Sequence, residues 1–138
     1  MASVYGEKRT SPQRERIAAA VDGMSRAFTI EELARRVRAR DTGTAVATVY
    51  RAVAAMEDSG YLARVGESGG HALYARCVVD DHHHHLVCTE CGAVAHAACP
   101  LDAGVLASVE RQGFVITRHE ITMYGLCRTC RRGVAEAS

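Results

Sequence analysis

The chain of 138 residues lacks the features that would place it in a membrane, in a secretory pathway or among common metalloproteases. It has no apolar run of about 18 residues, so we expect no membrane partner and no membrane-spanning segment. Its N-terminus lacks the apolar stretch of a secretory signal, so we expect a cytoplasmic protein. It also lacks an HExxH motif and a recognisable nucleophile–base pair, so we do not expect an enzyme.

What the chain does contain is six cysteines and seven histidines, in a composition that is 48% hydrophobic and 24% charged. These fractions are typical of a globular protein. Four of the cysteines form CxxC pairs, which in the absence of a signal sequence favour metal binding in a reducing compartment over disulfides.

Charge divides the chain into two parts. Residues 1–76 carry 12 Lys and Arg against 9 Asp and Glu, whereas residues 77–138 carry 5 against 7. This asymmetry predicts two modules with different partners. We place the first module at residues 1–77, a hinge at 78–81 and the second module at 82–138.

The first module is predicted to contain three helices followed by a β-hairpin. The helices begin at Pro12, at the capping box of Thr29 and at Thr44. The hairpin pairs residues 61–65 with residues 71–77. This order is typical of a winged helix-turn-helix, which lays its last helix in the major groove of DNA.

The second module is predicted to mix strands with one helix, so the fold class is α+β: a winged helix-turn-helix followed by a small α/β module. We expect strands at 83–87, 94–98 and 114–124, a helix from Pro100 to Gly113, and a frayed tail after Cys130.

The strongest chemical signal is the pair of motifs Cys88-x-x-Cys91 and Cys127-x-x-Cys130. Each turn places two thiolates close enough to form one edge of a tetrahedral site. Together they predict a closed structural zinc site, with redox dithiols as the alternative.

The run His82–His85 is the second signal. Side chains of a strand alternate between faces, so His83 and His85 share one face and the other two histidines share the opposite one. Cys77 precedes the run and His96 lies on the next predicted strand. A site of one thiolate and three imidazoles suits zinc and does not suit magnesium or calcium.

These motifs make the chain resemble the ferric uptake regulator superfamily, and within it the zinc uptake regulator branch most. The resemblance covers nearly the whole chain. It is carried by Ser11-Pro12-Gln13-Arg14, Ala47-Thr48-Val49-Tyr50-Arg51, the stretch from His82 to Gly92, and Tyr124-Gly125-x-Cys127-x-x-Cys130. It implies a homodimer with an N-terminal winged-helix DNA reader and a C-terminal dimerisation and metal-binding module.

The resemblance also implies ligands. The four CxxC cysteines match a structural zinc site, and His83 and His85 match the paired histidines of a regulatory site. Cys77 lies where zinc-sensing relatives carry cysteine, which favours zinc as the signal. Relatives of this type place an aspartate where this chain has Ala63. The fourth ligand is therefore open: His96 is the first choice, with His71 and Glu67 as alternatives.

A third site in relatives uses residues matching His82, His84 and His119 with a glutamate. Here the glutamate position is Ala103, so we expect Asp102 beside it to serve. Surface histidines without metal are the alternative. Cys99 is expected to be a small buried apolar residue, with a spare ligand or redox thiol as the alternative.

The third predicted helix carries the DNA-reading residues. Four apolar residues recur at helical spacing and predict its buried face: Val46, Val49, Val53 and Met56. Tyr50 and Arg51 fall off that stripe and match groove-contacting residues of the family, with Arg51 expected on phosphate and Tyr50 on a base edge. We expect the DNA contacts to come from Tyr50, Arg51, Thr48, Thr44 and Arg14.

The predicted function is a metal-responsive, above all zinc-responsive, repressor of metal-uptake genes that binds a palindromic double-stranded operator. Within this class, the signal could instead be iron, manganese, nickel or peroxide. Outside it, a zinc-dependent interaction module or a metalloenzyme is the alternative.

Overall fold

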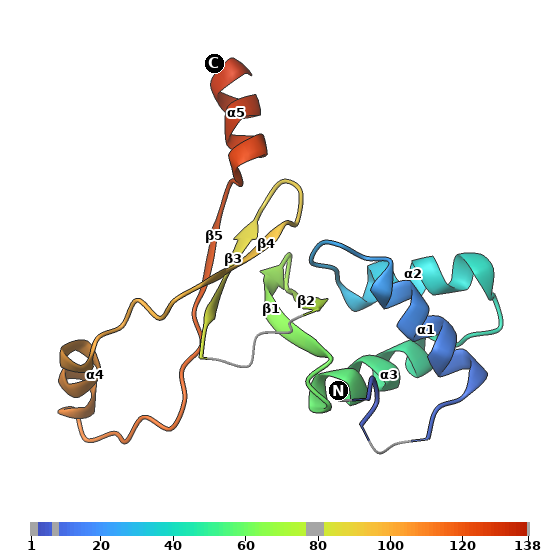
Figure 1. The fold of residues 1–138 in the computed structure, drawn as a ribbon, viewed down its shortest axis with the longest axis horizontal. Helices are drawn as coiled ribbons and strands as arrows, with labels where there is room; N and C mark the ends of the chain where they lie inside the picture. The colour runs from blue at the N-terminus through green and yellow to red at the C-terminus, as the bar shows by residue number, and fades with distance from the viewer. Residues whose placement is uncertain (1–2, 7–8, 77–81, 138) are drawn as a thin grey trace.

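The computed structural model describes residues 3–6, 9–76 and 82–137. The predicted hinge at 78–81 and the ligand candidate Cys77 lie outside these ranges. The described chain has the predicted α+β architecture, with three helices and a hairpin preceding a second, smaller sheet (Figure 1). No described helix has the length and apolar character needed to cross a membrane.

The N-terminal helices begin where their capping residues predict. Helix α1 spans Pro12–Asp22, and its N-cap hydroxyl on Ser11 accepts a hydrogen bond from the backbone N–H of Arg14. Helix α2 spans Ile30–Arg40, and the predicted capping box is present in both directions. Both predicted helix starts are confirmed.

Helix α3 spans Val46–Asp58, so the start predicted at Thr44 is wrong. The hydroxyl of Thr44 instead donates to a carboxylate oxygen of Asp41 over 2.8 Å, which holds this residue in the turn before the helix. Val46 is 40% exposed and so departs from the predicted stripe, whereas Val49, Val53 and Met56 are buried.

The first core lies between these helices and the hairpin of β1 (Leu62–Ser68) and β2 (His71–Arg76). It includes Ile17, Val21, Phe28, Leu33, Val37, Val49, Val53, Met56 and Leu62, all of them nearly or fully buried. A backbone bridge between Phe28 and Tyr74 ties the segment before α2 to the hairpin. The hairpin therefore packs as part of the helical module.

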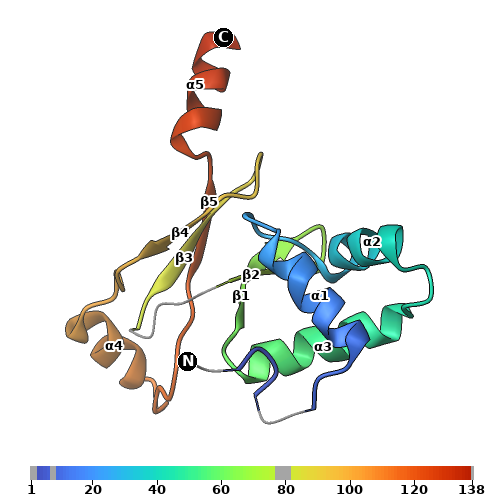
Figure 2. The same cartoon turned by 45° about the vertical axis from the view of Figure 1, so that its right-hand side comes forward.

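The second sheet has the strand order β4-β3-β5. Strand β3 (His84–Cys88) pairs antiparallel with β4 (Val94–Ala97) and parallel with β5 (Thr122–Gly125). The parallel pairing requires a crossover, and α4 (Ala103–Glu110) lies on it, well away from the first module (Figures 1 and 2).

Three predictions for this half are wrong in detail. The strand expected at 114–124 is confined to β5, because residues 114–121 form no strand. The helix expected from Pro100 begins after the N-cap Asp102. The tail expected to fray is helix α5 (Arg128–Ala137).

The two halves touch through the hairpin. A small cluster joins Val65, Leu73 and Ala75 of the hairpin to Val87 of β3. The hydroxyl of Thr122 donates to the backbone carbonyl of Val65 over 2.8 Å. The hairpin therefore packs directly on the sheet that carries the metal-ligand candidates.

A glycine allows a second contact of the same kind. The backbone N–H of Glu67 donates to the hydroxyl of Tyr124 over 2.6 Å. A Cβ at Gly66 would lie 2.7 Å from that hydroxyl, so only glycine lets β5 approach this closely.

Candidate metal sites and DNA-reading face

The four CxxC cysteines meet at one end of the second sheet. Their sulfur atoms all lie within 4.8 Å of one another, and the sulfurs of Cys91 and Cys127 are 3.7 Å apart. The parallel register that sets Cys88 opposite Gly125 brings the two motifs together. Gly92 closes the first turn with a φ of 75°, a conformation that favours glycine.

The electrostatics of this group fit a cation. The backbone N–H of Cys127 donates to the Cys88 sulfur over 3.4 Å, and this hydrogen bond lowers the pKa of Cys88 to about 6. Conversely, hydrogen bonding with Cys127 raises the pKa of Cys130 to about 12. Thiolates this close repel one another unless a proton or a cation lies between them. A closed set of four sulfur ligands is typical of structural zinc.

A second group contains His83, His85 and His96, whose ligand nitrogens also lie within 4.8 Å of one another. The register of β3 with β4 sets His85 opposite His96. The His83 ring stands edge-on to both, with centroid distances of 4.9 Å to His85 and 4.8 Å to His96. The predicted alternation of the histidine run therefore brings these three residues together.

The surroundings of the His85 ring favour its neutral form, which is the form that binds a metal. Its Nε2 is buried and has no hydrogen-bond partner among the described residues. Burial is the main cause that lowers its pKa, followed by the neighbouring His83. A neutral imidazole with an unpaired nitrogen fits a metal such as zinc.

The two alternative ligands lie elsewhere. Nδ1 of His71 is 3.6 Å from a carboxylate oxygen of Glu31, on the hairpin side of the first module. Glu67 pairs with Arg64 over 2.6 Å. Neither belongs to the group around His83, whereas His96 does.

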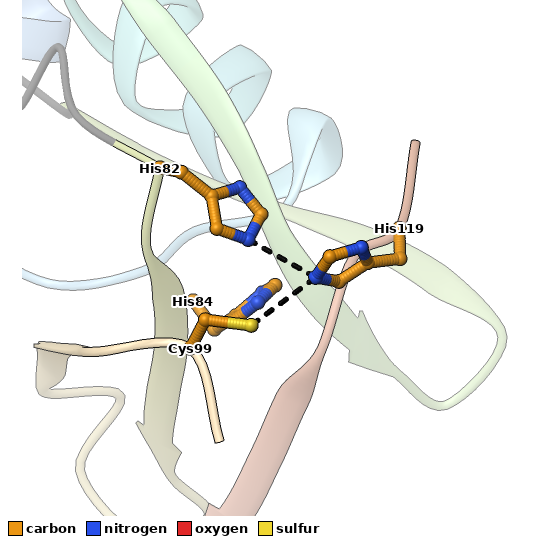
Figure 3. A group of neighbouring side chains, drawn as sticks. All are labelled: His82, His84, Cys99 and His119. Carbon is orange, nitrogen blue, oxygen red and sulfur yellow. Dashed lines mark hydrogen bonds between the residues drawn. The ribbon is translucent and has the colours of Figure 1, made fainter. Parts of the chain in front are cut away.

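A third group forms on the opposite face of β3 and contains His82, His84, His119 and Cys99 (Figure 3). The predicted histidines meet, but Asp102 does not join them. Its carboxylate accepts from the backbone N–H of Val105 over 2.8 Å and so caps α4. The expectation for Cys99 is also wrong, because it is only partly buried and its sulfur is 3.2 Å from Nε2 of His119.

The predicted DNA-reading residues differ in their availability. Tyr50 is 44% exposed, and its hydroxyl donates to Glu31 over 2.7 Å. The guanidinium of Arg51, which is also exposed, donates to the hydroxyl of Thr48 over 3.3 Å. Tyr50 and Arg51 are therefore exposed on α3, whereas Thr48 is partly buried.

Two other predicted contacts are placed differently. Thr44 is fully buried, so the structure contradicts a direct role in DNA contact. Arg14 is partly buried, and its guanidinium lies 4.9 Å from the centre of the Tyr5 ring. The sequence Asp41-Thr42-Gly43-Thr44 could have indicated this turn, because an aspartate side chain often accepts hydrogen bonds from groups that follow it closely in the chain.

Known proteins of one family are similar to this chain in sequence. The sequence profile described as "Ferric uptake regulator family" matches residues 6–124. The ferric uptake regulation protein of Bordetella parapertussis is 32% identical over 109 residues, which cover 78% of each chain.

Solved structures share this fold. A zinc uptake regulator complexed with zinc and DNA superposes with a TM-score of 0.73 at 23% identity, covering 92% of this chain and 86% of that one. A zinc-bound manganese uptake regulator superposes with a TM-score of 0.56 at 31% identity, covering 87% and 91%. On its sequence and its fold, this chain belongs to the ferric uptake regulator family of metal-responsive transcriptional regulators.

Proposed function

We propose that this protein is a zinc-responsive, homodimeric repressor of metal-uptake genes that acts in the cytoplasm. The observation that carries the proposal is the group of His83, His85 and His96 at the start of the second module. These ligands follow directly on residues 78–81, the proposed hinge. Metal bound there acts where the two modules join.

The donor chemistry supports zinc. The three imidazoles are joined in the proposal by the thiolate of Cys77, which follows the last residue of β2. Nitrogen and sulfur ligands suit zinc, whereas manganese prefers oxygen ligands. The related manganese uptake regulator, solved with zinc bound, supports a zinc-binding fold at 31% identity but leaves manganese as the second candidate signal.

The mechanism is linkage between the metal site and the orientation of the DNA reader. A cation at the site joins ligands from both sides of the hinge and so favours one arrangement of the two modules. The metal raises operator affinity only to the extent that it binds one arrangement of the modules more tightly than the other.

The DNA reader uses α3. Tyr50 and Arg51 are exposed polar residues of this helix, and Arg51 contacts phosphate while Tyr50 reads a base edge. In a homodimer, two copies of α3 read the halves of a palindromic operator in successive major grooves.

The second module offers the surface for that dimer. Residues 103–110 of α4 include no buried residue, and Val105, Val109, Met123 and Tyr124 are each at least 40% exposed. Apolar exposure on this scale is typical of a surface that a second copy covers.

The test measures DNA affinity against zinc. A palindromic duplex is first selected from a random pool at saturating zinc, and its affinity is then measured by fluorescence anisotropy at fixed salt. We expect zinc to raise the affinity at least about tenfold, corresponding to a coupling of about 1.4 kcal/mol. His85→Ala should abolish the response, and His71→Ala should retain it as the matched histidine control.

The choice of metal is tested in the same assay. Cys77→Ser should remove the zinc response, while a site read by manganese or iron would keep its own. An affinity that is unchanged by zinc in the wild-type chain, or an equal loss in His71→Ala and His85→Ala, would contradict the proposal.

A further inference from the structure

Tyr50 of α3 is hydrogen-bonded to a carboxylate from another helix. Its hydroxyl donates to an oxygen of Glu31 over 2.7 Å, and Nδ1 of His71 lies 3.6 Å from the same oxygen. Glu31 belongs to the first turn of α2, and His71 is the first residue of β2. One carboxylate therefore joins α2 and the hairpin to the side chain that is proposed to read a base edge.

The proton of this hydrogen bond lies on Tyr50. Hydrogen bonding with Tyr50 lowers the pKa of Glu31, and hydrogen bonding with Glu31 raises the pKa of Tyr50. The positive end of the α2 dipole also favours a carboxylate in the first turn of this helix. At neutral pH the carboxyl group is therefore ionised and the phenol is protonated.

This direction of donation limits what the Tyr50 hydroxyl can bind next. A tyrosine hydroxyl has one proton, so donating it to Glu31 leaves lone pairs that only accept hydrogen bonds. In the major groove, adenine and cytosine each present an exocyclic amino group as a donor. We propose that Glu31 makes Tyr50 a reader of such amino groups, so that its hydroxyl accepts a hydrogen bond from adenine or cytosine in the operator.

The same contact disfavours guanine and thymine at this position. Their O6 and O4 atoms are acceptors, and they would face a hydroxyl oxygen whose proton points toward Glu31. To donate to either atom, Tyr50 would have to give up a charge-assisted hydrogen bond. Glu31 is thus a positioning residue that sets base preference through the direction of the Tyr50 proton.

The exposure of these side chains fits a role in recognition better than one in stability. Tyr50 is 44% exposed, and the side chains of His71 and Glu31 are 58% and 44% exposed. Polar contacts between exposed groups contribute little to the free energy of folding. Substituting Glu31 should therefore leave the fold intact and change only what Tyr50 recognises.

This inference rests on the proposed function, because it requires α3 to read DNA. The test uses the zinc-loaded protein and the palindromic duplex selected at saturating zinc, at fixed salt. Duplexes with single substitutions first locate the base pair at which Tyr50→Phe loses the discrimination that the wild type shows. At that pair, purine then replaces adenine, or pyrimidin-2-one replaces cytosine, which deletes the amino group.

Deleting the amino group tests whether Tyr50 accepts from it. We expect the deletion to weaken binding of the wild type at least about fivefold more than binding of Tyr50→Phe. The comparison of the two proteins removes any effect of the analogue on the duplex itself. An equal loss in both proteins, or the absence of any pair at which Tyr50→Phe loses discrimination, would overturn the proposal.

Inverting the same base pair tests the role of Glu31, because inversion places an acceptor where the amino group was. The wild type should bind the inverted duplex at least about fivefold more weakly than the selected one. Glu31→Ala should lose less than about twofold, since its Tyr50 hydroxyl is free to turn and donate. Glu57→Ala is the matched carboxylate control and should behave like the wild type, because Glu57 lines the same cavity of about 320 Å³ as Glu31 and Tyr50.

The results separate this inference from the proposed function. If the zinc response is intact while Glu31→Ala rejects the inverted pair as strongly as the wild type, only this inference falls. A uniform loss of affinity for all duplexes in Glu31→Ala would likewise mean a structural role and overturn it. If zinc leaves the affinity unchanged while Glu31→Ala accepts the inverted pair, only the proposed zinc response falls. If no duplex is selected, both fall.

Discussion

The two halves of this molecule differ in how much apolar core they contain. In the first half, three helices and a hairpin enclose a continuous core that includes Ile17, Phe28, Leu33 and Met56. In residues 82–133, the buried residues are His84, Val87 and Cys88. The first half therefore has the apolar core of an ordinary small domain, whereas the second half has almost none.

This difference favours a structural role for the candidate metal groups. A module with so little apolar burial does not offset its conformational entropy without help from metal, disulfides or a partner chain. The second half carries all three ligand groups of the described residues, each built on β3 or the turn after it. We infer that metal binding supplies stability there that hydrophobic packing supplies in the first half.

The largest expected effect comes from breaking the four-cysteine group with Cys127→Ser. Structural zinc contributes about 10–16 kcal/mol in small zinc modules, so the second sheet should lose its fold. Hydrogen exchange should show lost amide protection in β3–β5 and retained protection in α1–α3. Cys99→Ser is the matched cysteine control and should keep the sheet. An equal loss of amide protection in both halves would contradict the idea that zinc stabilises the second half alone.

A matched pair of leucines tests the same contrast through packing. Leu33 is fully buried in the first half, whereas Leu86 of β3 is 38% exposed. We expect Leu33→Ala to lower the free energy of unfolding by about 2–5 kcal/mol and Leu86→Ala by less than about 1 kcal/mol. Urea unfolding of the zinc-loaded protein measures both. Similar losses for the two variants would mean that the halves are packed alike.

The contact between the halves should contribute less to the free energy of unfolding than the buried Leu33 does. Tyr124→Phe removes the acceptor of the Glu67 N–H, a hydrogen bond of about 1 kcal/mol. The amide of Glu67 should then exchange faster with solvent, which NMR can follow. Tyr61→Phe removes a hydroxyl that bonds to Asp22 inside the first half, so it should leave that amide unchanged.

The smallest expected effect is a pH dependence confined to the second half. Burial lowers the pKa of His84 and His85 below the ordinary value of 6.5. The folded state therefore binds fewer protons than the unfolded state as pH falls below about 6.5, so stability present above that pH is lost on acidification. Thermal melts between about pH 5 and 7.5, on protein that retains zinc in the four-cysteine group alone, should show this loss. His84→Gln combined with His85→Gln should flatten it, and His71→Gln should not.

Local chemistry made much of this structure predictable. Ser11, Thr29 and Pro12 place helix starts because capping groups act within one turn. The alternation of side chains along a strand divided the histidine run into two faces before any fold was known. The CxxC spacings predicted which cysteines would form pairs.

What the sequence did not reveal depends on segments that meet only in the folded chain. Cys99 joins His119 because the crossover between β4 and β5 returns to β3, and no periodicity records that return. The predictions for Thr44 and Asp102 fail for a local reason instead. The hydroxyl of Thr44 donates to Asp41, and the carboxylate of Asp102 accepts from the N–H of Val105, each across three residues of chain. The sequence by itself determined which residues could bind metal. The tertiary structure decided how they are grouped, because coordination depends on distances between atoms from strands far apart in the chain.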